Sequence, residues 1–531
     1  MGFLDRKVWA GLVCVLGLVV SCCVAARGQS GGGGVSGGSG EHEKKGAAAL
    51  EAVRGNPLDL REFLKGMPKG ADLHNHLSGA VYAESFIRVA AEEHMCVSLD
   101  TLVVTPGTAA TGGLEAKPEC GDGKVPAGTA LRDQHLYDAL VDAFSMRSFV
   151  PSTGITAHDH FFAAFAKFDK VYDAHLGDWI DEAATRAAAQ NEQYLELMHT
   201  PGSAHSVALG KEIGWHGDFA KVREALLAGG LDEDVAASKK SLDEAEALRK
   251  KRERCGEKDA AAACGVEVRY LCQILRGFPM ERVFAQTLEC FEIAASDPRY
   301  VGINMVMPED GYIARTDYAL HMKMIGFMHE VYPKVHISLH AGEIAPYEVP
   351  YEDLCCHIRL AVEVGHAERI GHGAEVMYED RPYELLKEMA AKHVMTEINL
   401  TSNDVILGVS GKEHPLPIYR KYHVPVALSS DDEGVSRIDL THEYVRAVQT
   451  YGFKYGELKA MVRTGVEHAF LPGQSLWVEA DEFGRVQAAC AGDLLGAEKP
   501  SGRCGEFLKG SEKARQQWEL ERRFGVFERK F

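Results

Sequence analysis

The sequence has no excess of positive charge. Its 531 residues include 58 Lys and Arg against 77 Asp and Glu, which gives a formal net charge of −19. Binding along a nucleic-acid backbone needs a cationic surface, so we expect no nucleic-acid partner. The sequence also contains no CxxC pair, which argues against a structural zinc site held by cysteines.

The chain also lacks an apolar run that is long enough to cross a membrane, since a spanning helix needs about 20 residues. The run from Val8 to Val20 is shorter and follows two basic residues, which predicts a signal peptide over residues 1–27. Small residues at 24–26 suit ordinary cleavage, whereas VVSC at 19–22 resembles a lipobox, which would leave a lipid anchor on Cys22. Either route predicts an exported protein that is periplasmic, secreted or lipid-anchored, with no spanning segment after processing.

The segment after the signal peptide is rich in glycine. Residues 28–40 read GQSGGGGVSGGSG, a composition typical of a flexible tether. We therefore predict a flexible linker over residues 28–46 and a folded part that begins at residue 47.

Ten of the 13 cysteines follow the signal peptide, and in an oxidising compartment some of them are expected to pair. Connectivity does not follow from sequence, but three pairs are close along the chain and lie in loop-rich segments. These candidate pairs are Cys96 with Cys120, Cys255 with Cys264, and Cys490 with Cys504. The remaining four cysteines, which we expect to be buried thiols, are Cys272, Cys290, Cys355 and Cys356.

From about residue 60, short β-rich runs alternate with longer helical stretches, a pattern typical of a parallel α/β fold. The eight predicted strands are 71–77, 193–198, 266–274, 301–307, 335–340, 369–372, 395–400 and 424–429. We predict a TIM-type (β/α)8 barrel over residues 47–475, with helical insertions at about 78–192 and 205–263. Residues 476–531 are predicted to form a C-terminal helical extension that packs on the barrel.

Histidines and carboxylates lie at the ends of these predicted strands. His74 and His76 end the first strand, where alternation places both rings on one face with Cα atoms about 6–7 Å apart. His340, His372 and Asp431 end the fifth, sixth and eighth strands. Because the C-terminal ends of barrel strands converge on one mouth, we predict a metal site there. Imidazole and carboxylate ligands suit a catalytic zinc ion.

Four sequence blocks carry a family resemblance. MPKGADLHNHLSG, ISLHAGE, RIGHG and LSSDDEG resemble, in order and spacing, the adenosine deaminase family of metal-dependent amidohydrolases. The resemblance extends from about Met67 to Tyr444. The signal peptide is similar to that of the secreted, growth-factor-related members, although too few residues precede the barrel for their additional N-terminal domain.

The resemblance implies one zinc ion held by His74, His76, His340 and Asp431. A second metal is not expected, because residues 304–307, which end the fourth strand, include no lysine that could bridge two ions. Zinc lowers the pKa of a bound water toward about 7, which makes hydroxide available.

The resemblance also assigns roles to the other residues of the blocks. Glu343 protonates a ring nitrogen of the substrate, which requires a raised pKa, while His372 orients the attacking hydroxide and Asp431 accepts its proton. The residues that the resemblance places against the substrate are Asp432, at the imidazole side of the purine, Gly342, His76 and Ser78.

Two positions depart from the family pattern. Many members carry an acidic residue, which contacts the 5′-hydroxyl of the sugar, at the position of Ser78. The glycine that follows the fourth strand in the family is not evident in residues 307–310, which read MPED. The HxE and PCxxC pattern of cytidine deaminases is absent, so that fold is excluded.

The sequence therefore predicts zinc-dependent hydrolytic deamination of adenosine and deoxyadenosine to inosine and deoxyinosine, with release of ammonia. A nucleoside is favoured over a nucleotide because no Arg/Lys cluster lies near the four blocks. Two alternatives stay open: another amino-purine or aminated heterocycle with the same chemistry, and a binding protein without turnover. No particular oligomeric state is predicted.

Overall fold

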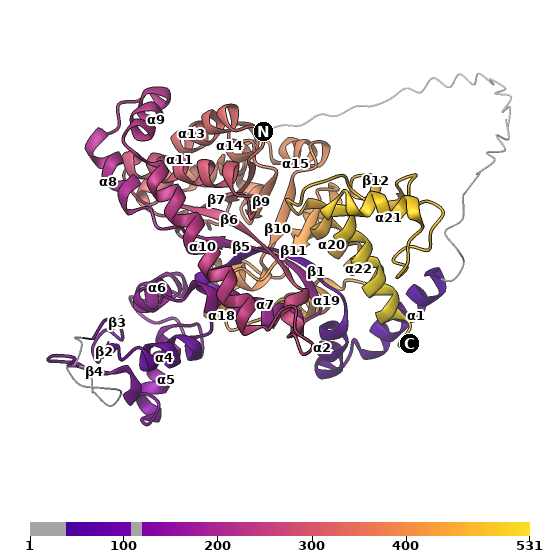
Figure 1. Cartoon of the computed structure of the whole chain (residues 1–531), viewed down its shortest axis with the longest axis horizontal. Coiled ribbons are helices and arrows are strands. Elements are labelled where there is room, and N and C mark those ends of the chain that lie inside the picture. Colours follow the sequence, from indigo (N-terminus) through magenta and orange to yellow (C-terminus); the bar gives the residue numbers. More distant parts are fainter. Residues whose placement is uncertain (1–38, 108–118) are drawn as a thin grey trace, which may run out of the picture.

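The computed structural model of the chain describes residues 39–107 and 119–531 (Figure 1). The predicted signal peptide, the candidate lipid anchor Cys22 and the start of the predicted linker lie outside these residues. Eight parallel strands form one sheet, and their order around it is their order along the chain. These strands are β1 (Gly70–His76), β5 (Glu192–His199), β6 (Glu267–Leu275), β7 (Tyr300–Val306), β8 (His336–Ala341), β9 (Arg369–His372), β10 (Met395–Ile398) and β11 (Val426–Leu428).

The sheet closes on itself at the seam between the first strand and the last. The backbone N–H of Asp431 donates to the carbonyl of His74 (2.8 Å), and the N–H of His76 donates to the carbonyl of Asp431 (3.0 Å). Eight parallel strands that are linked by helices form a barrel of the TIM type when the first strand pairs with the last. The predicted barrel is confirmed, and all eight predicted strands are present with bounds shifted by a few residues.

Helices between the strands cover the outside of the barrel. One example is α11 (Met280–Ser296), whose apolar residues Val283, Leu288 and Phe291 are buried where the helix packs on β6 and β7. Apolar side chains that recur at helical spacing create such a buried stripe. Further helices follow the strands along the chain, namely α13 (Tyr318–Val331), α14 (His357–Glu363), α15 (Pro382–Ala391), α19 (Leu440–Tyr451) and α20 (Tyr455–His468).

A lobe between β1 and β5 stands at the lower left of the molecule in Figure 1. Its elements are α4 (Ala83–Glu92), β2 (Cys96–Ser98), β3 (Val104–Thr105), β4 (Lys124–Pro126), α5 (Gln134–Ala143) and α6 (Ala157–Tyr172), and the chain then continues into α7 (Leu176–Ala189) beside the barrel. Phe86 stacks on Phe168 with 4.3 Å between ring centroids, and Trp179 meets Phe86 edge-on. This aromatic core joins α4, α6 and α7, so the lobe is tied to α7, which packs on β5.

The second predicted insertion, between β5 and β6, is helical. It contains α8 (Ala204–Ile213), α9 (Phe219–Ala228) and the charged helix α10 (Asp232–Arg252). Leu242 and Ala245 of α10 are buried where this helix packs against α7 and α11. The charged residues therefore lie on a helix that covers the outer layer of the barrel.

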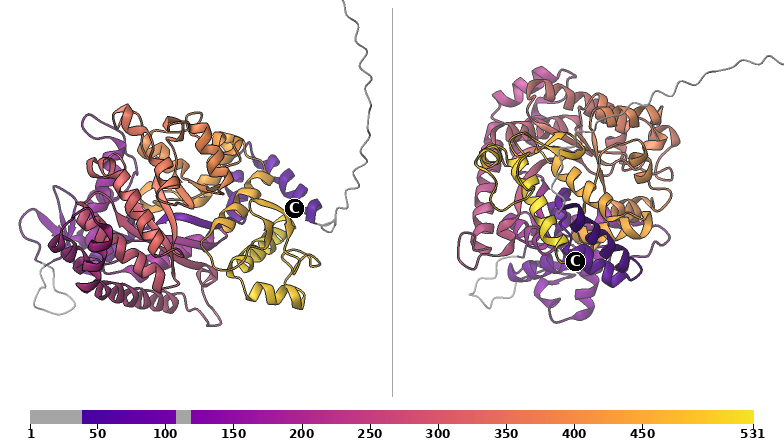
Figure 2. Two further views of the ribbon diagram at one scale, coloured as in Figure 1. Left: turned by 90° about the horizontal axis from the view of Figure 1, so that it is seen from above. Right: turned by 90° about the vertical axis from the view of Figure 1, so that its right-hand side faces the viewer.

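The C-terminal extension is only partly helical, which corrects the prediction. It begins with the hairpin β12 (Trp477–Glu479) and β13 (Glu482–Val486), and continues with α21 (Gly502–Lys509) and α22 (Glu512–Glu528). Helix α22 packs against α20 and against α1 (Ser39–Val53), and the views in Figures 1 and 2 show α1 beside α22.

Helix α1 also corrects the predicted linker, because residues 39–46 are helical rather than flexible. The segment after the glycines, EHEKKGAAALEAV, contains mostly good helix formers, and Leu50 is fully buried. Residues 39–46 therefore belong to the folded part, which the sequence predicts to begin only at residue 47.

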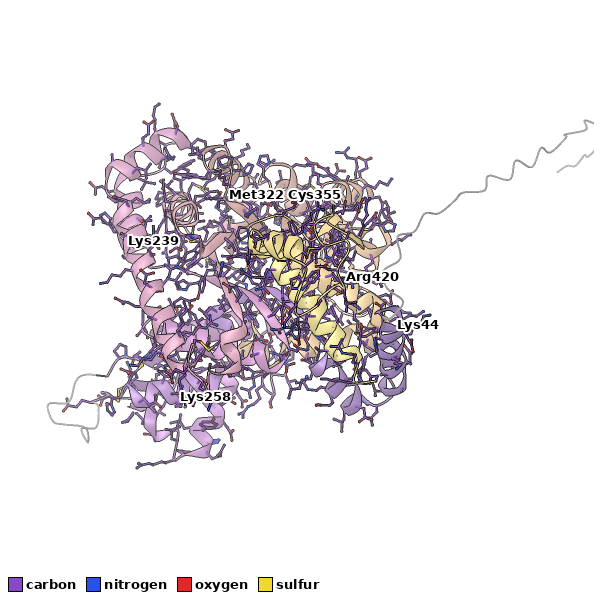
Figure 3. The ribbon with its side chains drawn as sticks, turned by 45° about the vertical axis from the view of Figure 1, so that its right-hand side comes forward. Lys44, Lys239, Lys258, Met322, Cys355 and Arg420 are labelled. Atoms are coloured by element: carbon purple, nitrogen blue, oxygen red, sulfur yellow. A yellow bond between two sulfur atoms is a disulfide. The ribbon has the colours of Figure 1, made fainter. Side chains whose placement is uncertain are left out.

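The three predicted disulfides are present, and two further ones correct the expectation of buried thiols. Cys272 pairs with Cys290 and Cys355 pairs with Cys356; Cys355 is labelled in Figure 3. Cys272 lies on β6 and Cys290 on α11, with Cα atoms 5.4 Å apart. Packing of the helix on the strand, which sequence spacing does not reveal, makes this pair.

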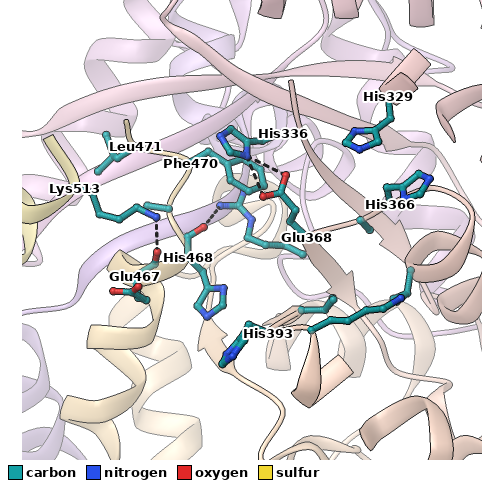
Figure 4. A pocket seen from close by; sticks show the side chains of 16 residues that line it. His329, His336, His366, Glu368, His393, Glu467, His468, Phe470, Leu471 and Lys513 are labelled. Carbon is teal, nitrogen blue, oxygen red and sulfur yellow. Dashed lines mark hydrogen bonds and ion pairs between the residues drawn. The ribbon is translucent and has the colours of Figure 1, made fainter. Parts of the chain in front are cut away.

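No helix among the residues that the structure describes is both long and apolar enough to cross a membrane. A cavity of about 510 Å³ lies at the N-terminal ends of β8, β9 and β10. Figure 4 shows that His336 on its wall is bonded to Glu368, and Lys513 to the backbone at Glu467. This cavity is at the end of the barrel opposite to the predicted site.

Candidate active site

Four histidines meet at the C-terminal mouth of the barrel. His74 and His76 come from β1, His340 from β8 and His372 from the end of β9. The ring centroid of His74 lies 4.4 Å from that of His340, 4.9 Å from that of His372 and 5.3 Å from that of His76. The structure therefore brings together the rings that the sequence placed at the ends of separate strands.

The inner ring nitrogens and the Asp431 carboxylate converge on one point. His76 Nε2 lies 3.1 Å from His340 Nε2, and Asp431 Oδ1 lies 3.4 Å from His74 Nε2 and 3.3 Å from His76 Nε2. His74 is fully buried, and its Nε2 has no hydrogen-bond partner among the described residues. A buried, unpartnered nitrogen beside a carboxylate and two further rings is a donor set that fits a divalent metal.

Both His76 and His372 border this point. Ligand atoms of His74, His340, His372 and Asp431 lie within 4.8 Å of one another, and those of His76, Asp431 and Asp432 form a second such group. Spacing alone therefore does not separate a ligand from a neighbouring ring, and the partners of the outer nitrogens provide a second criterion.

Three of the rings are held from behind by acceptor oxygens. An Nδ1 that donates a proton to an acceptor leaves Nε2 with its lone pair, which is the form that binds a metal. These three hydrogen bonds are His74 Nδ1 to Glu397 Oε2 (2.6 Å), His76 Nδ1 to Gln273 Oε1 (2.9 Å) and His340 Nδ1 to Asn304 Oδ1 (2.7 Å). In His372 the nearest partner of Nδ1 is instead an amide nitrogen, Asn403 Nδ2, at 3.0 Å.

The sequence analysis did not identify these three supporting residues. Gln273, Asn304 and Glu397 lie on β6, β7 and β10, within runs that are otherwise mostly apolar. A polar side chain on a strand that is covered on both faces was the signal that could have revealed them.

A charged network continues from Glu397 into the barrel. Arg369 is fully buried, with Nε 2.7 Å from Glu397 Oε1 and Nη2 2.6 Å from Glu196 Oε2. Burial alone would raise the pKa of Glu397, but Arg369 and His74 hold it below its usual value. Glu397 is therefore the ionised acceptor that fixes the His74 ring.

Glu343 lies beside the converging nitrogens, with Oε1 3.6 Å from His372 Nε2. Burial raises the pKa of Glu343 well above its usual range, and the neighbouring Asp431 carboxylate raises it further. This environment favours the protonated form of the carboxyl group, which can then donate its proton.

The loop that carries Glu343 is held by Glu309, a residue from the segment after β7. The backbone N–H groups of Gly342 and Glu343 donate to the two oxygens of Glu309 at 3.0 and 2.8 Å. Burial opposes ionisation of Glu309, but His357, whose Nδ1 lies 2.5 Å away, and Arg276 hold its pKa at about 2. Gly342 adopts a φ of +80°, which favours glycine, so its backbone conformation helps to shape this loop.

Asp432 lies at the mouth against the short helix α3 (Leu77–Ala80). Its Oδ1 is buried without a hydrogen-bond partner in residues 39–107 and 119–531. Burial, and then the Asp431 carboxylate, raise the pKa of Asp432 well above its usual range. A Cβ atom on Gly79 would lie only 1.6 Å from this Oδ1, so the glycine makes room for the Asp432 carboxyl group.

The two positions that depart from the family pattern also lie near the mouth. Ser78 is half-buried in α3, and its hydroxyl takes part in none of the hydrogen bonds of the described residues. Met307 directly follows β7 and has a φ of +94°, a region that favours glycine. The turn after β7 is therefore formed without the expected glycine.

Comparison with known proteins gives matches to deaminases. The sequence model of the adenosine deaminase family matches residues 158–476, more than half of the chain. The adenosine deaminase of Shewanella loihica is 36% identical over 136 residues, which cover 25% of this chain and 38% of that protein. The adenosine deaminase of Clostridium perfringens is 33% identical over 135 residues, 25% of this chain and 37% of that protein. The matched part of the chain thus spans less than two fifths of these curated relatives.

Among solved structures, the adenine deaminase of Arthrobacter aurescens aligns with 76% of this chain and 94% of its own, at 18% identity and a TM-score of 0.47.

The family match begins at residue 158 and therefore omits His74 and His76. In the structure these two residues lie at the same mouth as His340, His372 and Asp431, which the match includes. Since the family model covers more than half of the sequence, the chain belongs to the adenosine deaminase family.

Proposed function

We propose that the protein hydrolyses adenosine and deoxyadenosine to inosine and deoxyinosine, with release of ammonia, and that it uses one zinc ion. The observation that carries the proposal is the convergence of three imidazole nitrogens and the Asp431 carboxylate beside a buried Glu343 of raised pKa. A single donor cluster next to a proton donor suits metal-assisted hydrolysis.

His74, His76, His340 and Asp431 are the residues that would hold the zinc ion. Each of the three rings donates its outer proton to an acceptor and turns a lone pair inward, whereas His372 faces an amide nitrogen and does not share this arrangement. The chemistry that zinc supplies when it is bound is the activation of water as a nucleophile near neutral pH.

The residues of the chain account for the proton transfers. Asp431 accepts the proton of the attacking water as a bond forms to the purine carbon that carries the amine. Glu343 donates its proton to the adjacent ring nitrogen. Asp431 then passes the proton it accepted to the amine, which leaves as ammonia as the carbon–nitrogen bond breaks, and the hydroxyl proton returns to Glu343 as the carbonyl forms. The side chain of His372 faces Glu343 and Asp431 (3.6 and 3.8 Å) and orients the attacking oxygen.

Asp432 is proposed to bind the purine. The backbone of Gly342, which the resemblance places against the substrate, is instead bonded within the protein, since its N–H donates to Glu309 and its carbonyl accepts from Ala374. Because Asp432 is buried with a raised pKa and an unpartnered oxygen, its protonated carboxyl group can donate a hydrogen bond to a nitrogen on the imidazole side of the base. The basic side chains around the site are paired with carboxylates, which favours a nucleoside over a nucleotide. These pairs are Arg276 with Glu309, Arg186 with Glu433, and His158 with Asp310.

The test is an ultraviolet assay of the zinc-loaded protein with adenosine and deoxyadenosine, coupled to measurement of released ammonia. We expect loss of the adenosine absorbance and one ammonia per nucleoside consumed. A protein that binds one zinc ion but leaves both nucleosides unchanged would contradict the proposed substrate.

Ser78 supports a second candidate, the deamination of another amino-purine. Many family members place an acidic residue at this position to contact the sugar, and a hydroxyl group cannot replace that charge. The same assay with a panel of amino-purines decides between the two candidates. A zinc-loaded protein inert to the whole panel would favour a binding protein without turnover.

Export of the protein is part of this proposal. It is supported by the signal pattern in residues 1–27 and by the five disulfides among residues 39–107 and 119–531, because disulfides persist in oxidising compartments. Mass spectrometry of the protein from its host should show cleavage near Ala26 or a lipid on Cys22. An intact N-terminus on a cytoplasmic protein would contradict export.

Substituting Gly79 by alanine should weaken substrate binding. The new Cβ would lie 1.6 Å from Oδ1 and 2.7 Å from Cβ of Asp432, so the carboxyl group must move away from the base. We expect KM to rise about tenfold, the loss of one good hydrogen bond, with zinc content unchanged. Gly265→Ala is the matched control, because a Cβ there meets nothing within 4 Å. An unchanged KM in Gly79→Ala would argue against Asp432 as a substrate ligand.

Replacing Glu309 by glutamine should lower kcat by roughly tenfold, because one of the two backbone N–H groups at Gly342 and Glu343 loses its acceptor. The loop that carries Glu343 is then held less firmly, and a displaced proton donor reacts more slowly. Steady-state kinetics and a thermal melt of the zinc-loaded protein measure the effect. Full activity in Glu309→Gln would show that the loop does not depend on this carboxylate.

A further inference from the structure

His372 has two ring nitrogens in contrasting surroundings. On one side, Nδ1 lies 3.0 Å from the amide nitrogen of Asn403. The amide nitrogen of Asn399 lies at nearly the same distance from both ring nitrogens, 3.4 Å from Nδ1 and 3.5 Å from Nε2, and does not distinguish them. On the other side, Nε2 faces carboxyl oxygens, at 3.6 Å from Glu343 and 3.8 Å from Asp431. Because an amide nitrogen donates its proton, the short contact with Asn403 requires a lone pair on Nδ1. The proton of a neutral His372 is then on Nε2, which faces the Asp431 carboxylate.

The orientation of the Asn403 amide is itself fixed by a second histidine. Asn403 is fully buried in α16 (Leu400–Leu407), and its Oδ1 lies 3.1 Å from Nε2 of the buried His414. The other nitrogen of this ring, His414 Nδ1, lies 3.1 Å from the backbone N–H of Leu416.

A backbone N–H can only donate, and this determines the protons along the whole chain of contacts. His414 Nδ1 must accept from Leu416, so the proton of a neutral His414 is on Nε2 and is donated to the oxygen of Asn403. The amide nitrogen of Asn403 then points to His372 and donates to Nδ1. Burial lowers the pKa of His414 to about 4, which agrees with a neutral ring.

We propose that His414 and Asn403 are positioning residues that fix His372 as the tautomer with its proton on Nε2, so that His372 donates a hydrogen bond to the attacking oxygen and does not act as the base. The role of His372 in turnover rests on the proposed deamination, whereas the position of its ring proton does not depend on that function. An Nε2 that carries a proton has no lone pair, so the proton of the attacking water goes to Asp431.

This arrangement differs from that of the three rings assigned to zinc. They face acceptors on the outer side and carry lone pairs inward, and His372 faces a donor on the outer side and carries a proton inward. The hydrogen-bond partner of each Nδ1 atom therefore distinguishes the three histidines that are assigned to zinc from His372, which is assigned as a hydrogen-bond donor. In enzymes that depend on a particular histidine tautomer, reversing it costs up to ~10⁴ in kcat.

The first test is nitrogen NMR of the zinc-loaded full chain with ring-¹⁵N histidine, in which His372→Gln identifies the His372 signals. We expect a protonated Nε2 and an unprotonated Nδ1 in the wild-type protein. A proton on Nδ1, whether Nε2 is protonated or not, would overturn the proposal.

Two variants test the positioning residues. Asn403→Leu keeps the approximate volume but removes the donor, so kcat should fall ~10²-fold, as for the loss of one preorganised donor, while KM stays within about threefold and zinc content is unchanged. His414→Phe frees the amide to turn, and NMR should then show both tautomers of His372. An unchanged tautomer in both variants would overturn the role of Asn403 and His414.

The matched control is Asp404→Asn, at the next position of the same helix, where the side chain forms a surface pair with Arg446. Its kcat and its His372 signals should equal those of the wild-type protein. If kcat fell as far as in Asn403→Leu, the loss in Asn403→Leu would be explained by disturbance of the helix and the role of Asn403 would be wrong. Because NMR needs no turnover, the tautomer is decided even if no nucleoside is deaminated, which distinguishes failure of this inference from failure of the proposed function.

Discussion

Glu343→Gln is expected to lower kcat for adenosine about 10³-fold and to leave zinc content and the fold unchanged. Glutamine has nearly the same shape but cannot release a proton from its side chain to a ring nitrogen, and general acid catalysis contributes about 10²–10⁴-fold. The carboxyl group is suited to the role because burial and Asp431 raise its pKa. Stopped-flow or steady-state absorbance of the zinc-loaded variant measures the loss.

The same loop offers a matched control for this substitution. Glu348 follows Glu343 closely, and its Oε2 accepts a hydrogen bond from the N–H of Ala345 at 2.8 Å. Glu348→Gln should retain kcat within about threefold, because this carboxylate supports the loop and donates no proton to the substrate. If Glu343→Gln kept wild-type activity, the proton would have to come from another group and the assigned role would be wrong.

The elements that carry the site could be predicted because strand ends in a barrel converge. The sequence predicts His74, His340 and Asp431 at the ends of the first, fifth and eighth strands, and knowledge of the (β/α)8 pattern is sufficient to bring them together. In the structure the seam between β1 and β11 passes through two of these residues, since Asp431 bonds to the backbone of His74. The hydrogen bonds that close the barrel therefore also bring His74 and Asp431 together in the site.

The supporting residues could not be predicted, because their contacts depend on side-chain reach across the barrel. Glu397 bonds to His74 although the two strands, β10 and β1, are not neighbours in the sheet. Gln273 and Thr200 form a similar link to His76, through bonds of 2.9 and 3.0 Å. A sequence shows which positions point inward, but the lengths and rotamers that join them depend on the packed barrel.

The same limit explains the corrected predictions. The Cys272–Cys290 pair needs α11 to pack on β6, and α1 is helical beside α22, from the far end of the chain. Local sequence did favour a helix after the glycines, but the contact of α1 with α22 and the pairing of Cys272 with Cys290 join segments that are distant in sequence, and local patterns do not reveal such partners.

Removing the metal with a chelator is expected to abolish activity and to lower the melting temperature by roughly 5 °C. Without a cation, the Nε2 atoms of His76 and His340 face each other at 3.1 Å, and the buried Nε2 of His74 keeps no partner within the described residues. Lone pairs in a buried cluster are costly unless a proton or a metal satisfies them. Differential scanning fluorimetry and the absorbance assay, before and after addition of Zn²⁺, measure both effects.

Asp431→Ala provides the control, because it removes the carboxylate that faces both His74 and His76. This variant should be inactive, should bind zinc weakly, and should show no further change in melting temperature when the chelator is added. In the wild-type protein Zn²⁺ should restore both activity and stability, since binding to the folded state alone shifts the unfolding equilibrium. If chelation changed neither property in a protein shown to be metal-free, the converging nitrogens would be satisfied by protons instead, and deamination by this site would need a different source of nucleophile.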